Sequence, residues 1–562
     1  MAGPLHIPMH IPTRRHVLAA GAAGAAGALL SGCTGDPRPV RPGPVAHVAN
    51  WAPGPGAAPP GARRRGKVIT AWPAEAQSYD PAIGWDLHSW EAISTVLHSP
   101  LYHYRGQHDG PAPHAAAAMP EVSRDGRVYT VPLRRNVRFH NGRPVTAQDY
   151  IASWTRILDP ELASWAASFL FTIEGAEAVY EQKAEKVSGL KALDSHTLQI
   201  RLAEPDVLML ALLCQPYTAA LPAEEIRRLG SSFGRTPVGT GPYRVTRYDS
   251  KRQRATFQSF DQYFWPGTPL IDTVEFRWGI DYAMQSLQLH AGSIDILGEG
   301  LVASQAPKFT ADRETRKRFV HPVPVRGSQW LALNLKRKEL RDRRVRQALN
   351  WAVDREQLMR VTFGLSDPWG CPFPENLDRY QRTAKPYTYD PDRARALLRQ
   401  AGVSRLRLDF PHGSQEPWPL LAQVLQQQFA EVGVHVELRS MGQAAFDQLT
   451  AEGEGDIYGR HMYITLNSAL ENVSSNFTSS ASYNYTGYKN TRVDELTDKA
   501  RTARTPESSN TVLAQVEEEL IRDAAGVFIG SMRFLAARRP EVRNYQMRGE
   551  SGSYYDRMWL GD

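Results

Sequence analysis

Cysteine is scarce in this chain of 562 residues, which contains three, at positions 33, 214 and 371. Neither a Cys-x-x-Cys nor a His-Glu-x-x-His spacing occurs, which excludes the most common zinc signatures. The apolar run near the start, residues 17–30, covers 14 residues, whereas a membrane-spanning helix needs about 20. No long basic stripe and no nucleic-acid motif occurs, so the sequence indicates no nucleic-acid partner.

The beginning of the chain has the layout of a lipoprotein signal peptide. Leu30-Ser31-Gly32-Cys33 looks like a bacterial lipobox, in which the cysteine is lipidated and the preceding peptide is removed. Arg14-Arg15 supplies the positive region before the apolar run. Residues 13–18 resemble a twin-arginine export motif, although a Sec route stays open. We expect residues 1–32 to be a signal peptide and Cys33 to anchor an extracytoplasmic protein to the cell membrane.

The segment that follows predicts a tether. Residues 34–66 contain eight prolines and many glycines and alanines. Such a composition cannot bury enough apolar surface to fold. We therefore expect residues 33–66 to be a disordered tether between the membrane and a folded body that begins near Lys67.

The charge balance is mild. Lysine and arginine number 66 and aspartate and glutamate 59, which gives a net charge of +7, or +5 without Arg14 and Arg15. The two signs are interspersed, as in Arg341-Asp342-Arg343-Arg344, which is typical of a solvated surface.

Strand and helix patterns are mixed along the body. Residues 128–131 follow a turn dipeptide and predict a strand, and the apolar spacing of residues 345–353 predicts a helix. Asp390, Pro391 and Gly402 mark the start and stop of a second helix. Residues 406–438 have a strand-helix-strand pattern, which implies parallel pairing with a right-handed crossover. The fold class is α/β with additional antiparallel sheet.

Several segments in fixed order resemble the extracytoplasmic solute-binding proteins of family five, the oligopeptide- and dipeptide-binding receptors of ABC importers. The resemblance runs along nearly the whole mature chain. The matching segments are residues 125–130, 137–149, 154–160, 237–243, 291–296 and 345–355.

The resemblance implies a periplasmic-binding-protein-like fold of type II, in the large cluster with an extra subdomain. Two lobes would enclose a ligand in a hinged cleft and present it to an ABC permease in the membrane. We expect lobe one to comprise residues 67–325 and 527–562, and lobe two residues 326–526. The hinges would be the crossings near residues 323–326 and 526–529.

Some of the matching residues have a structural explanation. Gly142 fits a turn that needs a positive φ, and Thr146 fits a helix N-cap followed by an acid in the first turn. Gly239-Thr240-Gly241-Pro242 lacks the Gly-Lys-Ser/Thr ending of a phosphate loop and predicts a structural turn. We expect His140 to be a structural histidine.

The ligand is less clearly indicated, because the chain departs from the peptide-binding pattern. Peptide receptors of this family place an aspartate in a ligand loop to meet the ammonium end of the peptide, since a buried cation needs a paired anion. The corresponding stretch is residues 456–468, where Thr465 or Asn467 stands near the expected position and Arg460 adds a positive charge. Neutral or anionic ligands, such as sugars, blocked peptides or acidic metabolites, therefore become more credible than a free peptide amino terminus.

By family analogy, three loops approach the cleft. Aromatic faces stack on sugar rings and on apolar side chains alike, and ligand sites are commonly lined by them. The candidate ligand-binding residues are Trp85, His88, Trp369, Phe373, Tyr463, Thr465 and Asn467. Inter-lobe packing without ligand contact is an alternative interpretation for the aromatic members.

The sequence favours a receptor over other classes of function. Histidines cluster at positions 88, 98, 103, 108 and 114, but they lack metal-ligand spacing, so we predict no metal and no cofactor. No carboxylate pair stands out as acid and base, so we predict no catalytic residue and regard an exported hydrolase as less favoured. A sensory lipoprotein that presents a bound signal would share the fold. We expect a monomer, and the sequence leaves open whether Cys214 and Cys371 form a disulfide.

Overall fold

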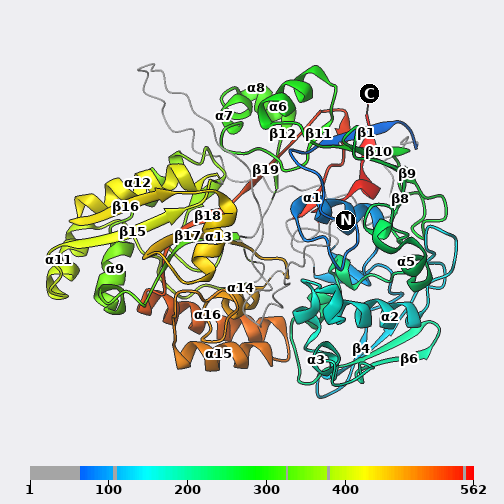
Figure 1. Ribbon diagram of the computed structural model, residues 1–562, viewed down its shortest axis with the longest axis horizontal. Coiled ribbons are helices and arrows are strands. Elements are labelled where there is room, and N and C mark those ends of the chain that lie inside the picture. Colours follow the sequence, from blue (N-terminus) through cyan, green and yellow to red (C-terminus); the bar gives the residue numbers. More distant parts are fainter. Residues whose placement is uncertain are drawn as a thin grey trace, which may run out of the picture.

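The computed structural model describes residues 64–104, 110–323, 327–375, 377, 380–414, 416–466, 468–548 and 552–561. The predicted signal peptide, Cys33 and nearly all of the predicted tether lie outside these residues, as does Asn467. The described chain forms two lobes that lie side by side in Figure 1. None of its helices combines the length and the apolar character needed to cross a membrane.

Lobe one is built on a seven-stranded mixed sheet. β1 pairs in parallel with β10 and β11, whereas β9 and β19 pair antiparallel to their neighbours. The apolar side chains of these strands enter two cores: one includes Tyr555 of the C-terminal segment, and the other includes Ala71 and Leu297. The strands in spatial order are β12 (Val320–Val323), β19 (Phe534–Arg538), β11 (Ile296–Leu297), β1 (Lys67–Ala71), β10 (Thr273–Arg277), β9 (Arg254–Ser259) and β8 (Tyr243–Asp249).

Helices and short elements complete lobe one. Three helices lie together at one end of it in Figure 1: α6 (Tyr282–Ala291), α7 (Ala306–Thr310) and α8 (Arg313–Phe319). The other short elements are α1 (Leu87–Ala92), η1 (Ile93–Leu97), β2 (Tyr102–Tyr104), β3 (Pro111–Pro113), α4 (Met209–Leu212), η4 (Pro216–Thr218), η5 (Gly230–Gly234), β20 (Val542–Arg543), β21 (Met547–Arg548), β22 (Gly552–Ser553), η7 (Tyr555–Arg557) and β23 (Trp559–Leu560).

A subdomain of lobe one has its own antiparallel sheet and its own core. Its strands in spatial order are β4 (Glu121–Val122), β5 (Val128–Pro132), β7 (Thr197–Arg201) and β6 (Leu190–Asp194), and its helical elements are α2 (Ala147–Ile157), η2 (Pro160–Leu162), η3 (Ala167–Leu170), α3 (Ala176–Tyr180) and α5 (Ala223–Leu229). The predicted strand at residues 128–131 is confirmed by β5.

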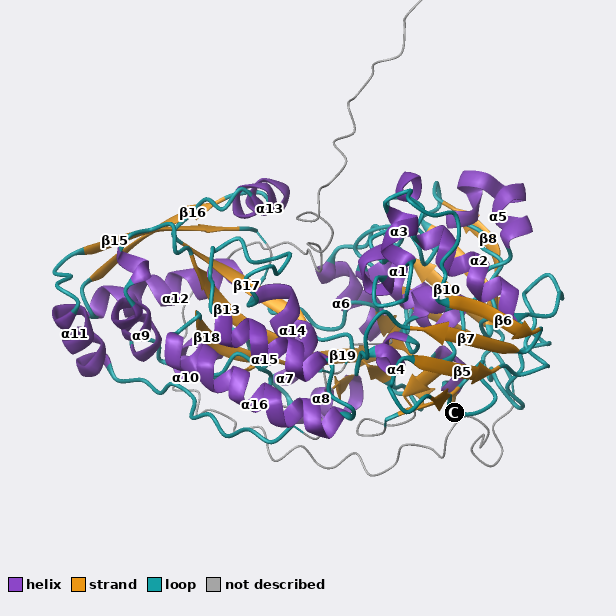
Figure 2. Cartoon of the chain, turned by 90° about the horizontal axis from the view of Figure 1, so that it is seen from below, coloured by secondary structure: helices purple, strands orange, loops and turns teal. Residues whose placement is uncertain are grey.

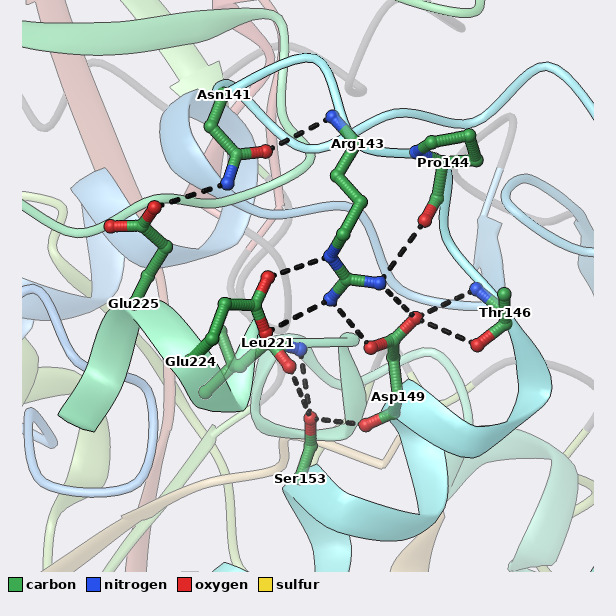
Figure 3. A network of polar contacts seen from close by, with 9 residues as sticks. All are labelled: Asn141, Arg143, Pro144, Thr146, Asp149, Ser153, Leu221, Glu224 and Glu225. Carbon is green, nitrogen blue, oxygen red and sulfur yellow. Dashed lines mark hydrogen bonds and ion pairs between the residues drawn. The ribbon is translucent and has the colours of Figure 1, made fainter. Parts of the chain in front are cut away.

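The start of α2 shows what the matching segment 137–149 does. Thr146 and Asp149 form a capping box, which confirms the predicted N-cap, and Gly142 has a φ of +89°. Arg143 joins this helix start to α5, because it binds Asp149 at 2.7 Å and Glu224 at 2.6 Å (Figure 3). The network holds the helix start, the preceding turn and α5 together.

Lobe two contains a four-stranded antiparallel sheet and a parallel strand pair. The sheet has the order β14 (Ser366–Pro368), β18 (Gly526–Met532), β13 (Gly327–Leu333) and β17 (Ile457–Tyr463). The other elements are η6 (Glu339–Arg341), α9 (Arg343–Trp351), α10 (Arg355–Arg360), α11 (Pro391–Gln400), β15 (Leu406–His412), α12 (Trp418–Glu431), β16 (Val434–Ser440), α13 (Gln443–Ala451), α14 (Ala469–Asn476), α15 (Thr491–Arg501) and α16 (Pro506–Asp523).

The patterned segments of lobe two fold as predicted. The predicted helix at residues 345–353 is α9, and Asp390 caps α11, which ends just before Gly402 at a φ of +71°. β15 and β16 pair in parallel, and α12 lies between them in the chain. The strand-helix-strand prediction is therefore confirmed.

The second crossing between the lobes lies later than the sequence indicated. β18 pairs with both β13 and β14, so residues 527–532 belong to the sheet of lobe two and not to lobe one. Its alternate side chains Val527 and Ile529 enter one core of lobe two, and Phe528 enters another, because a central strand is buried on both faces. The chain passes from β18 to β19 at Arg533.

The two buried cysteines do not form a disulfide. Cys214 lies in the core of the lobe-one subdomain, whereas Cys371 is buried in lobe two. Burial raises the pKa of the Cys371 thiol to about 12, which keeps it in the unreactive thiol form.

His140 and the Gly239–Gly241 turn, both expected to be structural, bind each other. The Gly239 N–H donates to His140 Nδ1, and His140 Nε2 donates to the Gly241 carbonyl, each at 3.1 Å. A Cβ on either glycine would lie within 2.5 Å of backbone atoms of Leu97. Burial lowers the pKa of His140 to about 3, and a proton on Nδ1 would also displace the Gly239 N–H.

This arrangement makes His140 a source of acid sensitivity. Its unfolded-state pKa is about 6.5, so the unfolded chain binds the proton first as the pH falls, and stability is lost from there down to the folded-state pKa. Between pH 7 and pH 5 the loss from His140 alone is about 2 kcal/mol. His140→Gln should lose about 2 kcal/mol less unfolding free energy than the wild-type protein between pH 7 and pH 5. Urea titrations at the two pH values measure this difference. His435→Gln, at an exposed strand position, is the matched control. An equal loss of unfolding free energy between pH 7 and pH 5 in His140→Gln and in the wild-type protein would show that His140 is not the source of the acid sensitivity.

Candidate ligand-binding site

The predicted ligand loop connects β17 to α14 and is organised by one carboxylate. Glu471, in the first turn of α14, is 7% exposed. It accepts hydrogen bonds from the Thr465 N–H at 2.8 Å, the Thr465 hydroxyl at 2.6 Å and the Leu466 N–H at 2.7 Å. Hydrogen bonds to an ionised acceptor are stronger than neutral ones. Glu471 therefore fixes the conformation of the loop.

Sequence reasoning missed Glu471. It found no carboxylate at Thr465, yet the structure places the Glu471 carboxylate against that residue from six positions later. Ser468 and Glu471 have the spacing of a capping box, and Ser468 does cap α14. That signal predicts an acid at the helix start, but it does not show that the side chain turns back to Thr465.

The ligand loop also contacts lobe one. Gln215 Nε2 donates to the Thr465 carbonyl at 3.1 Å. Close by along the chain, Asp206 pairs with Arg501 of α15 at 3.3 Å. These two contacts join lobe one to lobe two in addition to the chain crossing at Arg533, so the ligand loop lies at the junction of the lobes.

His88 sits in a charged cluster on the lobe-one side. It contacts Asp86 at 3.1 Å and Glu299 at 2.7 Å, and the Tyr282 hydroxyl donates to the second oxygen of Glu299 at 2.6 Å. Burial alone would lower the pKa of His88, but its hydrogen bonds with the two carboxylates outweigh burial and raise the pKa to about 9. His88 is therefore a cation at neutral pH, held between two anions.

Tyr463 approaches this cluster from lobe two. It is the last residue of β17 and packs against the core of lobe one. Burial, and then the charge of Glu299, raises the pKa of Tyr463 to about 12. Nearby, the Ser304 N–H of lobe one donates to Glu416 of lobe two at 3.0 Å. His88 and Tyr463 thus lie at one junction of the lobes, as Thr465 does.

The other three described candidates have different surroundings. Trp85, just before α1, is 37% exposed. Trp369 is held within lobe two, because its indole N–H donates to the Phe373 carbonyl at 2.7 Å and Arg382 stacks on its ring at 4.5 Å. Phe373 is fully buried in a core that combines apolar side chains of lobe two, including Ile464 and Leu466 of the ligand loop, with Leu208 and Ala211 of lobe one.

Arg460 lies on the face of β17 opposite to Tyr463, because side chains alternate along a strand. Its guanidinium stacks on the rings of Tyr483 at 5.5 Å and Tyr485 at 5.7 Å. It forms no ion pair with a carboxylate of the described chain. The positive charge noted in the sequence thus lies against two aromatic rings.

Two features of the described chain concern the hydrolase and metal alternatives. The Gly-x-Ser-x-Gly spacing of hydrolase elbows occurs at Gly230–Gly234, but there it forms the short helix η5 after α5 and not a strand-to-helix turn. Within the residues that the structure describes, no three histidine, cysteine, aspartate or glutamate side chains are grouped to hold a metal ion.

Known proteins resemble this chain over most of its length. It is 26% identical over 407 residues to the di/tripeptide-binding protein 2 of Pseudomonas aeruginosa, covering 68% of this chain and 74% of that protein. It is 26% identical over 447 residues to the glutathione-binding protein GsiB of Pectobacterium atrosepticum, covering 76% and 81%.

The fold matches that of a solved two-lobed binding protein. The periplasmic binding protein DppA of Helicobacter pylori, solved with the peptide STSA, superposes with a TM-score of 0.74 at 22% identity, covering 89% of this chain and 99% of that one. The relatives are binding proteins and not enzymes. The model of the bacterial extracellular solute-binding proteins, family 5, matches residues 110–484, and the chain belongs to this family.

Proposed function

We propose that this protein is a lipid-anchored receptor that captures a peptide-class or related solute between its lobes and delivers it to an ABC permease. The observation that carries the proposal is the ligand loop, which Glu471 holds in lobe two and Gln215 contacts from lobe one. A solute bound there would touch both lobes at once. Anchoring would be through Cys33, outside the cytoplasm.

The connections between the lobes suit a hinge. One passes at Arg533, whose N–H donates to the Leu365 carbonyl at 2.8 Å and whose side chain pairs with Asp367. Closure about hinges traps a ligand and changes the surface offered to a membrane partner. A ligand favours the closed state only through contacts that the open state lacks, since equal affinity for both states shifts nothing.

The two sequence relatives, a di/tripeptide-binding protein and a glutathione-binding protein, support a small peptide or glutathione as the ligand. The Glu471 carboxylate supplies a negative charge beside Thr465, and so restores a free amino terminus as a possible ligand group. Oligosaccharides and other non-peptide solutes form the alternative class, because Thr465 carries no charge of its own. A sensory protein that presents a ligand would use the same junction.

Thermal shifts of residues 67–562 against a panel of solutes test the proposal. The panel contains free and N-acetylated peptides, glutathione, oligosaccharides, acidic metabolites and nickel chelates. A ligand at a hundred times its dissociation constant adds about 2.7 kcal/mol of stability, which corresponds to about 1 to 3 °C at this size. A shift with one solute class supports the proposal and names the class, whereas no shift across the panel would contradict it.

A further inference from the structure

Four aromatic side chains of lobe one gather next to the ligand loop. This aromatic cluster consists of Trp90 on α1, Trp165, Phe169 on η3 and Tyr217 on η4. Ring centroids are 5.9 Å apart for Trp90 and Trp165, 5.1 Å for Trp165 and Tyr217, and 5.6 Å for Phe169 and Tyr217. Tyr217 is buried, whereas the other three rings are only partly covered.

The position of the aromatic cluster is fixed by its contacts with lobe two. Tyr217 follows Gln215 by two residues, and Gln215 binds the Thr465 carbonyl. The Glu471 charge is close enough to add to the effect of burial in raising the pKa of Tyr217. In Figures 1 and 2, α1 lies on the side of lobe one that faces lobe two. The three partly covered rings all contact Tyr217 and therefore lie close to the ligand loop.

Two buried polar atoms beside the aromatic cluster have no hydrogen-bond partner in the described chain: the indole N–H of Trp165 and the Oε1 of Gln215. Gln215 is 1% exposed, and its Nε2 is already used by Thr465, so the amide orientation is determined. A buried donor and a buried acceptor without partners are unfavourable unless something binds them. A peptide group offers both a carbonyl acceptor and an N–H donor.

We propose that the aromatic cluster receives an aromatic side chain of a peptide-class ligand, while Trp165 and Gln215 bind a peptide group of the same ligand. This inference rests on the proposed function and names its specificity. Aromatic rings prefer edge-to-face or offset contacts with other rings, and such contacts add to the effect of burial. A ligand with an aromatic side chain should therefore bind more tightly than one with an aliphatic side chain of similar apolar area.

Calorimetric titration with matched peptides tests this inference. The probes are acetyl-Ala-Phe-Ala-amide, acetyl-Ala-Leu-Ala-amide and acetyl-Ala-Lys-Ala-amide, the same three peptides with free amino termini, and cellotriose. The Phe peptide should bind about tenfold more tightly than the Leu peptide. Trp165→Phe keeps a ring but removes the N–H, and it should weaken the binding of the Phe peptide and of the Leu peptide equally. Phe169→Leu should reduce the preference for the Phe peptide to about threefold or less.

Phe171→Leu is the matched control, because the ring of Phe171 packs on Tyr180, and no described ring contact joins it to the aromatic cluster. It should retain the tenfold preference. Equal affinities for the Phe and Leu peptides in the wild-type protein, or a preference that survives Phe169→Leu, would overturn the inference and leave the proposed function intact. Binding of cellotriose alone would also overturn it. Binding of none of the probes or of the wider solute panel would contradict the proposed function, and this inference with it.

Discussion

Cys33→Ser is expected to move the protein from the membrane fraction into the surrounding medium. In the proposed arrangement the acyl chains on Cys33 attach the protein to the membrane. Each buried methylene contributes about 0.8 kcal/mol, and two or more chains anchor a protein stably whereas one chain does so only marginally. Removal of the cysteine removes all of this free energy at once.

Fractionation of cells followed by immunoblotting measures the effect. Cys214→Ser is the matched control, because it changes a cysteine in the core of lobe one and leaves the lipobox intact; it should stay with the membrane. A Cys33→Ser protein that remains in the membrane fraction would contradict lipid anchoring, but it would not affect the assignment of the fold or the family.

Arg382→Ala is expected to lower the free energy of unfolding by about 3–5 kcal/mol, the usual result of breaking a buried ion pair. Arg382 Nε lies 3.0 and 3.1 Å from the two carboxylate oxygens of Glu517, whose side chain is fully buried. Arg382 Nη2 also donates to the Phe373 carbonyl at 3.0 Å. Burial raises the pKa of Glu517 and the Arg382 charge opposes that rise, so without Arg382 the carboxyl must take up a proton or remain an unpaired buried charge.

Urea titration monitored by circular dichroism measures this loss. Arg395→Ala is the control, because Arg395 pairs with Asp392 at 2.7 Å on a surface where the Asp392 side chain is 91% exposed. An exposed pair contributes about 0–1 kcal/mol. A loss below about 1 kcal/mol for Arg382→Ala would show that the buried pair with Glu517 of α16 does not stabilise lobe two.

Local sequence signals predicted individual elements of the fold well. Asp390, Pro391 and Gly402 delimit α11 because each acts within one helical turn. The crossing between the lobes was misplaced for the opposite reason: residues 526–532 form one apolar strand, and only its pairing with β13 and β14 shows which sheet it joins. Strand partners are set by tertiary contacts that a single sequence does not contain.

The candidate site was less predictable for a related reason. His88, Tyr463 and Thr465 lie at the lobe junction, and the family resemblance pointed to their loops. Glu299 and Gln215 were missed because they come from distant parts of the chain and meet His88 and Thr465 only after folding. Phe373 was chosen for its aromatic ring, yet an apolar ring fits a core as well as a ligand site, and the structure places it in the core.

Binding of the solute at the lobe junction is tested most directly by calorimetric titration. Wild-type protein and Glu471→Gln are titrated with the solute that gives the largest thermal shift. Glutamine keeps the size of the side chain but removes the charge and one acceptor from the ligand loop. We expect one binding site per chain, at least about tenfold weaker binding in Glu471→Gln and an unchanged circular dichroism spectrum. Equal affinities for the two proteins would contradict the placement of the solute at this junction.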